Sequence, residues 1–252
     1  MHLPRSLEAF PQIRVLEQTG STNDELKGGS DAGDFSIVVT DHQTAGRGRL
    51  GRVWVAPPGQ TLAISVLLRP GTGADSFGWL PLIAGLAMSR TVSRLLPDAS
   101  VGLKWPNDVQ IGGLKVSGIL AEVTGDADAV ILGAGLNLSI PADQLPTPVA
   151  TSIGLHGDGD PDRALHGYLS ELHGLYSAFR KASGDAEASG IRTALIEACT
   201  TIGQAVKVQL PGGEILTGEA TGVDESGRLL VRTSDGSEVA VAAGDVTHLR
   251  YE

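Results

Sequence analysis

The sequence has one cysteine, Cys199, among its 252 residues. A single thiol forms no internal disulfide and, without a second cysteine, no cysteine-rich zinc site. Cys199 lies in the apolar pattern IRTALIEACT, which predicts a buried core thiol. The histidines show no spacing typical of metal ligands, so no metal site built by the protein is predicted.

Long apolar runs are also missing. The first twenty residues contain no uninterrupted apolar stretch of the kind a signal peptide needs, and no other run approaches the length that spans a membrane. We therefore expect a cytoplasmic protein with no membrane partner.

Positive charge and aromatic rings are scarce. Lys and Arg number 19 against 29 Asp and Glu, which gives a net charge of −10 and a pI of about 5.0. Such a surface repels phosphate backbones, and aromatic residues at 4% leave few rings on which bases could stack. A nucleic-acid-binding module is therefore disfavoured.

The residues that are present predict mixed α and β structure. Gly 34 and Pro 13 are high for a helical bundle, and 41% hydrophobic residues are enough for one large domain or two modest ones. Short runs rich in Val, Ile and Leu predict strands at 36–40, 61–68, 101–104, 115–124 and 129–138. Apolar residues at steps of three and four predict helices at 77–96, 165–179 and about 185–200, and a short helix starting near Ser21.

The sequence pattern changes from helical periodicity to alternating apolar residues after Cys199. Short alternating runs (AVKVQL, ILTGEATGV, RLLVRT, EVAVAA) are separated by PGGE, DESGR and SDGS turns. This pattern predicts a small all-β domain at 201–252 that is stabilised by packing against a larger domain at 1–200.

A glycine pattern in the larger domain is open to two interpretations. Residues Gly46 to Gly51 satisfy G-x-G-x-x-G and follow a predicted strand, which is typical of a nicotinamide-binding site. Trp54, Pro57 and Pro58 follow at once, however, so no helix can begin at the glycines, and nothing between His42 and Ala74 is acidic to hold a ribose. A dehydrogenase is therefore disfavoured.

The same loop carries Arg47, Arg49 and Arg52. These could form a solvated basic turn, but three guanidinium groups so close in an acidic protein favour a clamp for carboxylate or phosphate. Lys115 lies in an otherwise apolar strand, where a lone charge is costly without a partner, and a substrate anion would supply one.

Four segments together resemble the catalytic domain of biotin protein ligases over roughly residues 15 to 140. They are Ser21-Thr22-Asn23, the stretch QTAGRGRLGRVW at 43–54, KWPND at 104–108 and KVSGILAE at 115–122, with GAGLN at 133–137 just beyond. The resemblance implies a mixed α+β catalytic domain, like those of class II aminoacyl-tRNA synthetases and biotin synthetases, followed by a small SH3-like β-barrel.

It also implies an activity. Such an enzyme would convert biotin and ATP, with Mg²⁺, to biotinyl-5'-AMP and pyrophosphate. It would then transfer biotin to a lysine of a biotin carrier domain of acyl-CoA carboxylase or pyruvate carboxylase. A lipoate ligase uses the same fold, but the polar residues near Ser21 and the GRGRLGRVW loop favour biotin. Only twenty residues precede Ser21, too few for a three-helix DNA-binding unit, so we expect no specific DNA partner and no repressor activity. A monomer or weak homodimer is expected.

The resemblance assigns roles to individual residues. Those expected to act in catalysis are Lys115, Arg47 and Asp108, the last as acceptor of the proton from the incoming lysine. Those expected to bind biotin are Ser21, Thr22, Asn23, Gln43, Gly46, Arg47, Gly48, Arg49, Lys115 and Gly118. Those expected to bind ATP or the adenylate are Arg49, Trp54, Lys104, Asn107 and Asn137.

Some of these positions have simpler interpretations. Ser21 and Thr22 could cap a helix, and that role is compatible with binding biotin. Asn107 and Asp108 could form a turn after Pro106, while Trp105 is better interpreted as a core residue.

Overall fold

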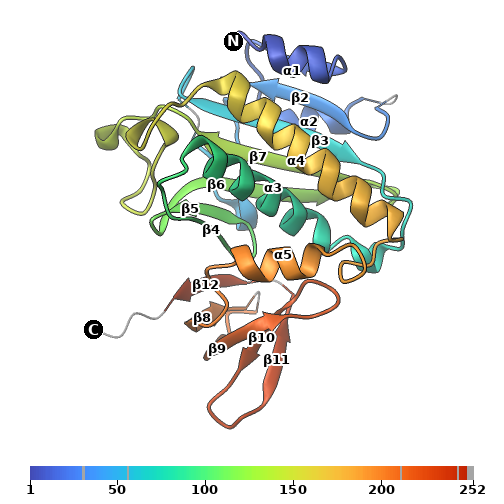
Figure 1. The fold of residues 1–252 in the computed structure, drawn as a ribbon, viewed down its shortest axis with the longest axis vertical. Coiled ribbons are helices and arrows are strands. Elements are labelled where there is room, and N and C mark those ends of the chain that lie inside the picture. Colours follow the sequence, from blue (N-terminus) through green and yellow to red (C-terminus); the bar gives the residue numbers. More distant parts are fainter. Residues whose placement is uncertain (30–31, 56, 211, 243, 249–252) are drawn as a thin grey trace.

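The computed structural model describes residues 1–29, 32–55, 57–210, 212–242 and 244–248. Its larger part is built on a seven-stranded mixed sheet in the order β1-β2-β3-β7-β6-β5-β4 (Figure 1). β1 pairs with β2 in parallel and every other neighbouring pair is antiparallel. The strands are β1 (Ile13–Val15), β2 (Ser36–Thr40), β3 (Thr61–Leu68), β4 (Val101–Lys104), β5 (Asp108–Ile111), β6 (Leu114–Val123) and β7 (Val130–Asn137).

One face of the sheet is covered by long helices. α3 (Trp79–Leu95) and α4 (Pro161–Lys181) lie across it, α1 (Pro4–Ala9) packs on α4, and α5 (Ile191–Ala198) lies near the end of α3 (Figure 1). α4 begins where Asp160 accepts a hydrogen bond from the Arg163 amide, followed by Pro161, whose fixed φ suits a first helical turn.

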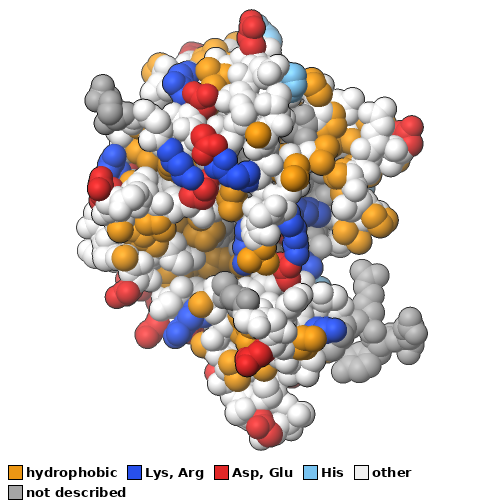
Figure 2. Space-filling view, turned by 180° about the vertical axis from the view of Figure 1, so that it is seen from behind, with side chains coloured by type: hydrophobic (Ala, Val, Ile, Leu, Met, Phe, Trp, Pro, Cys, Tyr) orange, Lys and Arg blue, Asp and Glu red, His pale blue; other side chains and the backbone are white. Residues whose placement is uncertain are grey.

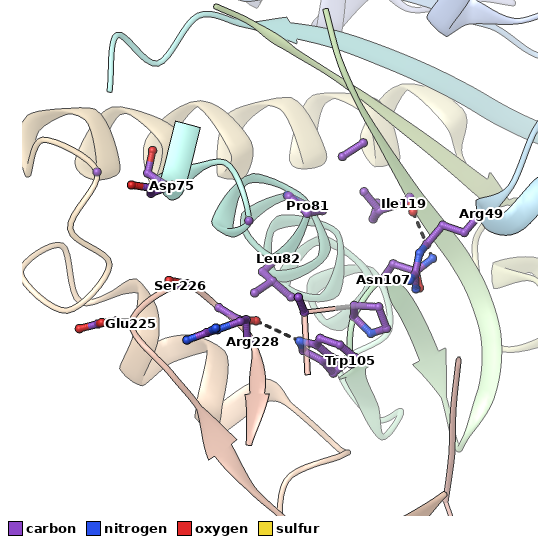
Figure 3. Close-up of a pocket in the computed structure, with 17 residues that line it drawn as sticks. Arg49, Asp75, Pro81, Leu82, Trp105, Asn107, Ile119, Glu225, Ser226 and Arg228 are labelled. Atoms are coloured by element: carbon purple, nitrogen blue, oxygen red, sulfur yellow. Dashed lines mark hydrogen bonds between the residues drawn. The ribbon is translucent and has the colours of Figure 1, made fainter. Parts of the chain in front are cut away.

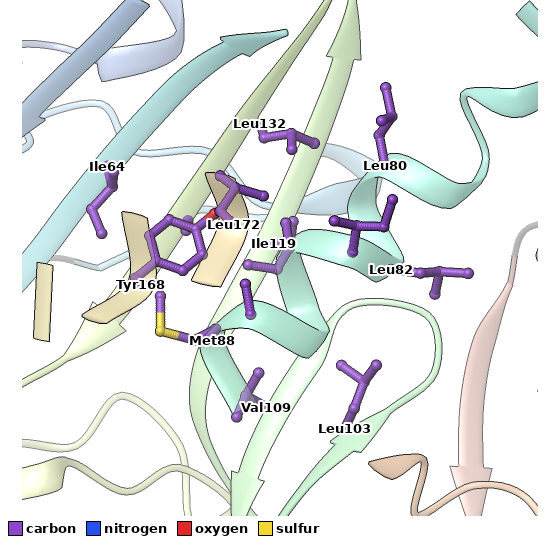
Figure 4. Packing of buried hydrophobic residues seen from close by; sticks show 14 of the residues in the cluster. Ile64, Leu80, Leu82, Met88, Leu103, Val109, Ile119, Leu132, Tyr168 and Leu172 are labelled. Atoms are coloured by element: carbon purple, nitrogen blue, oxygen red, sulfur yellow. The ribbon is translucent and has the colours of Figure 1, made fainter. Parts of the chain in front are cut away.

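The main core lies between these helices and the sheet. Ile64 of β3 and Leu132 of β7 meet Met88 of α3 and Tyr168 and Leu172 of α4 there (Figure 4). β3 is buried along its whole length, which explains its nearly continuous apolar run, because both faces of a central strand are covered.

The opposite face of the sheet is only partly covered. The short helix α2 (Thr22–Lys27) packs there over a second, small core of Leu26, Val38, Leu67, Ala129 and Ile131. The part of this face formed by Gly118 and Leu120 of β6 and by the second half of β7 lines a space instead of packing under a described helix. That leaves room for a cavity.

The smaller part is a five-stranded antiparallel sheet in the order β11-β10-β9-β8-β12. Its strands are β8 (Ala205–Gln209), β9 (Ile215–Val223), β10 (Leu229–Arg232), β11 (Glu238–Val241) and β12 (Asp245–His248). The turn between β9 and β10 fixes it to the larger part: Trp79 Nε1 donates to Glu225 O at 2.7 Å and Trp105 Nε1 to Gly227 O at 3.2 Å. The division into domains at residue 200 itself stays a prediction.

Most predicted elements are found. The strands at 36–40, 61–68 and 101–104 have the bounds expected, and β6 and β7 differ from expectation by a residue at each end. The predictions that Cys199 and Trp105 are buried are confirmed, with 7% and 2% of their surface exposed.

The helix expected from about residue 185 is wrong over its first part, since α5 starts at Ile191. Gly190, at φ +75°, interrupts the helical backbone, and the Asp185 carboxylate accepts hydrogen bonds from the Glu187 and Ala188 amides in a turn. α1, β1 and β5 were not expected, and β12 lies in the predicted all-β domain although no run had been named for it. None of the helices in the described part of the chain combines the length and the hydropathy that crossing a membrane requires.

Candidate functional site

A cavity of about 450 Å³ lies on the open face of the main sheet, where the smaller sheet meets the larger part. Viewed from this side, the molecule is hollowed near its middle, and Lys and Arg side chains gather around the hollow (Figure 2). Its walls come from α2, the loop from Gln43 to Val55, the turn from Lys104 to Asp108, the segment 146–150 and β12. Segments that are distant in the sequence therefore meet at one site.

Glycines form the floor of the cavity. A Cβ atom on Gly133 would lie 2.5 Å from Asn23 Oδ1, one on Gly135 would lie 2.8 Å from Trp54 Nε1, and one on Gly118 would lie 3.0 Å from Lys115 Nζ. Any larger residue would displace these side chains, so the glycines let Asn23, Trp54 and Lys115 lie against the sheet. Gly118 was among the expected residues, whereas Gly133 and Gly135 had been given no role.

The end of the cavity at α2 is polar and already ordered. Gln43 Oε1 accepts hydrogen bonds from the Thr22 amide at 2.9 Å and from Thr22 Oγ1 at 3.0 Å. Ser65 of β3 contacts Thr22 Oγ1 at 2.7 Å and Asn23 Oδ1 at 2.5 Å. Ser21 makes no capping hydrogen bond through its side chain, so the helix-cap interpretation does not account for it.

The three arginines of the loop have partners within the chain. Arg47 forms a bidentate pair with Asp24, at 2.7 Å through Nη2, and Arg52 forms an ion pair with Asp245 of β12. Arg49 donates to Asn107 Oδ1 at 2.9 Å. All three guanidinium groups thus have acceptors within the chain, because the fold brings acceptors from distant segments to the loop. The anion clamp itself stays a prediction.

These surroundings shift the pKa values of three cations, one upward and two downward. The hydrogen bond to Asp24 raises the pKa of Arg47, although its partial burial acts against this. Burial lowers the pKa of Arg49, and the nearby carboxylates of Asp245 and Asp108 offset part of that effect. Burial likewise lowers the pKa of Lys104.

Lys115 also has a partner within the protein. Its Nζ lies 2.6 Å from Asp108 Oδ1 and 5.9 Å from the centre of the Trp54 ring. The charge of Lys115 therefore has a partner in the chain, which the sequence had not suggested, and its contact with a substrate anion stays a prediction. β5 and β6 are adjacent strands, and Asp108 pairs in register with Gly118, three residues after Lys115.

The far end of the cavity holds the residues expected at the nucleotide. Asn137 is 3% exposed and donates through Nδ2 to Thr151 O at 2.8 Å, and Asn107 Nδ2 donates to Ile119 O at 3.1 Å. Trp54 Nε1 is buried and has no hydrogen-bond partner among the described residues.

All but one of the expected site residues line this single cavity. Gly46 is the exception: it supports the loop from behind, where its Cβ atom would lie 2.6 Å from Trp54 O and 2.8 Å from Gln43 Nε2. The sequence reasoning missed a second group of residues at the site, namely Ser65, Glu122, Gly133, Gly135, Asp245 and the segment 146–150. The spacing of GAGLN is a signal that could have identified the two glycines.

A second cavity, of about 820 Å³, adjoins the first one. It lies between the start of α3 and the turn around Gly227, and Arg49, Trp105, Asn107 and Ile119 line both cavities (Figure 3).

Comparison with known proteins shows which family shares this arrangement. Residues 14–137 match the model of the biotin/lipoate A/B protein ligase family, and residues 201–249 match the biotin protein ligase C terminal domain. The chain is 40% identical over 247 residues to a biotin--[acetyl-CoA-carboxylase] ligase of Mycobacterium tuberculosis, covering 95% of this chain and 90% of that protein. This chain belongs to the biotin protein ligase family.

Other members are similar at the level of sequence and structure. The bifunctional ligase/repressor BirA of Bacillus subtilis is 31% identical, over 88% of this ligase chain and 69% of that protein. The structure of the Aquifex aeolicus biotin protein ligase in complex with biotin and ATP has a TM-score of 0.80 and 28% identity, covering 95% of this chain and 100% of that one. The Leishmania major biotin protein ligase in complex with biotinyl-5-AMP has a TM-score of 0.60 and 28% identity, covering 92% and 99%. The resemblance stated from the motifs is thereby confirmed.

Proposed function

We propose that this chain is a biotin--[biotin carboxyl-carrier protein] ligase. It would activate biotin with ATP to biotinyl-5'-AMP and pyrophosphate, and would then transfer biotin to a lysine of a carrier domain of acyl-CoA carboxylase or pyruvate carboxylase. One observation carries the proposal: the ordered polar cluster of Thr22, Asn23 and Gln43 lies in the same cavity as Lys104, Arg49 and Lys115. The polar cluster offers the hydrogen-bond donors and acceptors that a cyclic urea needs. The three cations suit a site where a carboxylate reacts with a phosphate.

Charge neutralisation would be the role of the cations that line the cavity. Activation brings the biotin carboxylate and the α-phosphate together, and two unit charges about 4 Å apart repel by about 4 kcal/mol at an effective dielectric of 20. Lys115, Arg49 and Lys104 would compensate those charges, and two of these groups are already held in place, Lys115 by Asp108 and Arg49 by Asn107.

The pairing of Lys115 with Asp108 suggests how the two steps are linked. The biotin carboxylate would compete with Asp108 for the Lys115 ammonium group. Once released, the Asp108 carboxylate would be available to accept the proton of the acceptor lysine, as expected from the motif.

Mg²⁺ would enter with the nucleotide. No group of three or more His, Cys, Asp or Glu side chains in the described parts of the chain is arranged to hold a metal ion. The ATP phosphates would therefore supply the principal ligands, and the ion would add positive charge beside Arg49 and Lys104. A cytoplasmic location, a monomer or weak homodimer and the absence of operator binding stay predictions.

The direct test is incubation of the purified protein with labelled biotin, ATP, Mg²⁺ and a biotin carrier domain. We expect biotin-dependent release of pyrophosphate and label on the carrier. Lys115→Ala should lower the rate of pyrophosphate release at least about a hundredfold, since it removes a fixed charge at the developing acyl-phosphate. Lys207→Ala, at an exposed position of β8, is the control and should retain the wild-type rate. No pyrophosphate release and no labelled carrier from the wild type would refute the proposal.

A further inference from the structure

Behind the polar end of the cavity, Glu122 of β6 joins α2 to the arginine loop. Its Oε2 accepts a hydrogen bond from Asn23 Nδ2 at 2.6 Å and lies 3.4 Å from Arg47 Nη2, while its Oε1 accepts one from Lys27 Nζ at 2.6 Å. Glu122 is not among the residues that line the cavity. Any effect it has on a ligand must therefore pass through the residues it holds.

Glu122 determines how the amide of Asn23 is oriented. Ser65 Oγ lies 2.5 Å from Asn23 Oδ1, but a hydroxyl can either donate or accept, so Ser65 alone would allow the amide to be reversed. An ionised carboxylate only accepts hydrogen bonds, so Glu122 requires the Nδ2 group on its own side. Gly133, which has no side chain, leaves the space for Oδ1 above β7.

The charges around Glu122 keep it ionised at neutral pH. Burial acts to raise its pKa, but the hydrogen bonds from Lys27 and Asn23 and the charge of Arg47 hold the pKa below its ordinary value. Asp24 completes the group, since it accepts both hydrogen bonds of the Arg47 pair. Two carboxylates thus balance two cations beside Asn23.

We propose that Glu122 is a positioning residue of the biotin site, which fixes the donor and acceptor directions of Asn23 and holds Arg47 where the loop crosses the cavity. This inference rests on the proposed function. A cyclic urea presents N–H donors and a carbonyl acceptor at fixed angles, so a reversed Asn23 amide would face it with the wrong group.

The test measures biotin binding by calorimetry without ATP, and then KM for biotin and for ATP from pyrophosphate release. Glu122→Ala should raise both the Kd and the KM for biotin about tenfold or more and leave the KM for ATP within twofold of the wild type. It should weaken desthiobiotin, which keeps the ureido group, by the same factor as biotin. The Kd of Glu122→Gln for biotin should lie between those of the wild type and Glu122→Ala. A glutamine oxygen can still accept a hydrogen bond from Asn23, but the negative charge is lost.

Lys27→Met is the matched control. It removes one partner of Glu122 but leaves the contact with Asn23, so the Kd for biotin should stay within about threefold. A Glu122→Ala protein that binds biotin as tightly as the wild type, or whose KM for biotin and for ATP rise together, overturns the inference. Should Glu122→Ala not fold, Glu122→Gln carries the same comparison. If the wild type itself binds no biotin, the proposed function fails instead.

Discussion

Buried polar groups of individual residues differ in whether the fold supplies a partner. At the site, Lys115 has Asp108 and Asn23 has both Ser65 and Glu122. In the main core, the Tyr168 hydroxyl is fully buried and has no hydrogen-bond partner among the described residues. Burial without a partner raises the pKa of Tyr168, since nothing stabilises a phenolate there. Tyr168 is thus a buried polar residue to which the described part of the fold supplies no partner, whereas Lys115 and Asn23 have theirs.

Removing the Tyr168 hydroxyl should stabilise the protein. Tyr168→Phe keeps the ring between Met88 and Leu172 and removes a group whose desolvation is uncompensated, so the free energy of unfolding should rise by about 1 kcal/mol. Urea unfolding followed by circular dichroism would measure the change. Tyr176→Phe is the matched control: its hydroxyl donates to Asp34 at 2.8 Å, and its loss should lower the free energy of unfolding by about 1 kcal/mol. A Tyr168→Phe protein less stable than the wild type would contradict this interpretation.

Among the elements, those with long apolar runs could be predicted from the sequence and the short ones could not. β3 shows eight buried positions in a row, and α3 repeats apolar residues over several turns. β1 has three residues and α1 has six, too few for a period to be recognised. Their positions depend on partners far along the chain, which no local pattern contains.

At the site, too, local patterns were predictable and contacts between distant segments were not. The motifs were sufficient to identify the segments that line the cavity, because each motif is local. The partners of the arginines were not predictable, because Arg47 and Asp24 are 23 residues apart and Arg52 and Asp245 are 193 apart. The packing of α2 and of β12 around the loop brings these groups together.

Asp162 is the residue that holds α1 in place. Its Oδ1 accepts from the Ser6 amide at 2.9 Å and from Ser6 Oγ at 2.7 Å, and its Oδ2 accepts from the Arg5 amide at 2.9 Å. Asp162→Ala should lower the free energy of unfolding by about 2 kcal/mol, since it leaves the buried Ser6 amide without its acceptor, while Ser6 Oγ keeps the backbone oxygen of residue 162 at 3.2 Å. Thermal unfolding and hydrogen exchange of residues 4–9 would measure it.

The difference in free energy of unfolding between Asp162→Ala and the wild type should shrink at low pH. Burial acts to raise the pKa of Asp162, but the hydrogen bonds from Ser6 and Arg5 hold it below its ordinary value of 3.8. A carboxyl with a lowered pKa in the folded state contributes stability that is present above pH 3.8 and is lost as the pH falls through the folded pKa. Asp158→Ala, on an exposed ion pair with Arg163, should cost at most a few tenths of a kcal/mol. A difference between Asp162→Ala and the wild type that persists undiminished at the lowest pH would exclude this account.

At the scale of the whole molecule, the smaller sheet is connected to the chemistry through the turn around Gly227. Trp105, which donates to Gly227 O, belongs to the same turn as Lys104, Asn107 and Asp108. The backbone amide of Trp105 also donates a hydrogen bond to Thr201 Oγ1 at 3.1 Å. β12 adds Asp245 to the wall of the cavity. The smaller sheet is therefore positioned to fix the geometry of the cavity.

Gly227→Val should disturb the site from a distance. Gly227 has φ +78°, and its Cβ atom would lie 2.8 Å from Leu82 Cδ1, so a valine would strain the turn and push it away from α3. We expect pyrophosphate release to slow about tenfold, because a small displacement of Trp105 moves Lys104 and Asp108 with it. Faster proteolysis near residue 200 should accompany the loss of activity.

Gly236→Val separates docking from backbone strain. Gly236 lies in the turn between β10 and β11 at φ +84°, and its Cβ atom would meet nothing within 4 Å. The valine therefore costs the same kind of backbone strain in the same sheet without touching the larger part. Its rate of pyrophosphate release should match the wild type even if its melting temperature falls. Equal loss of rate in the two variants would show that strain within the smaller sheet, and not its contact with Trp105 and α3, is what the site responds to.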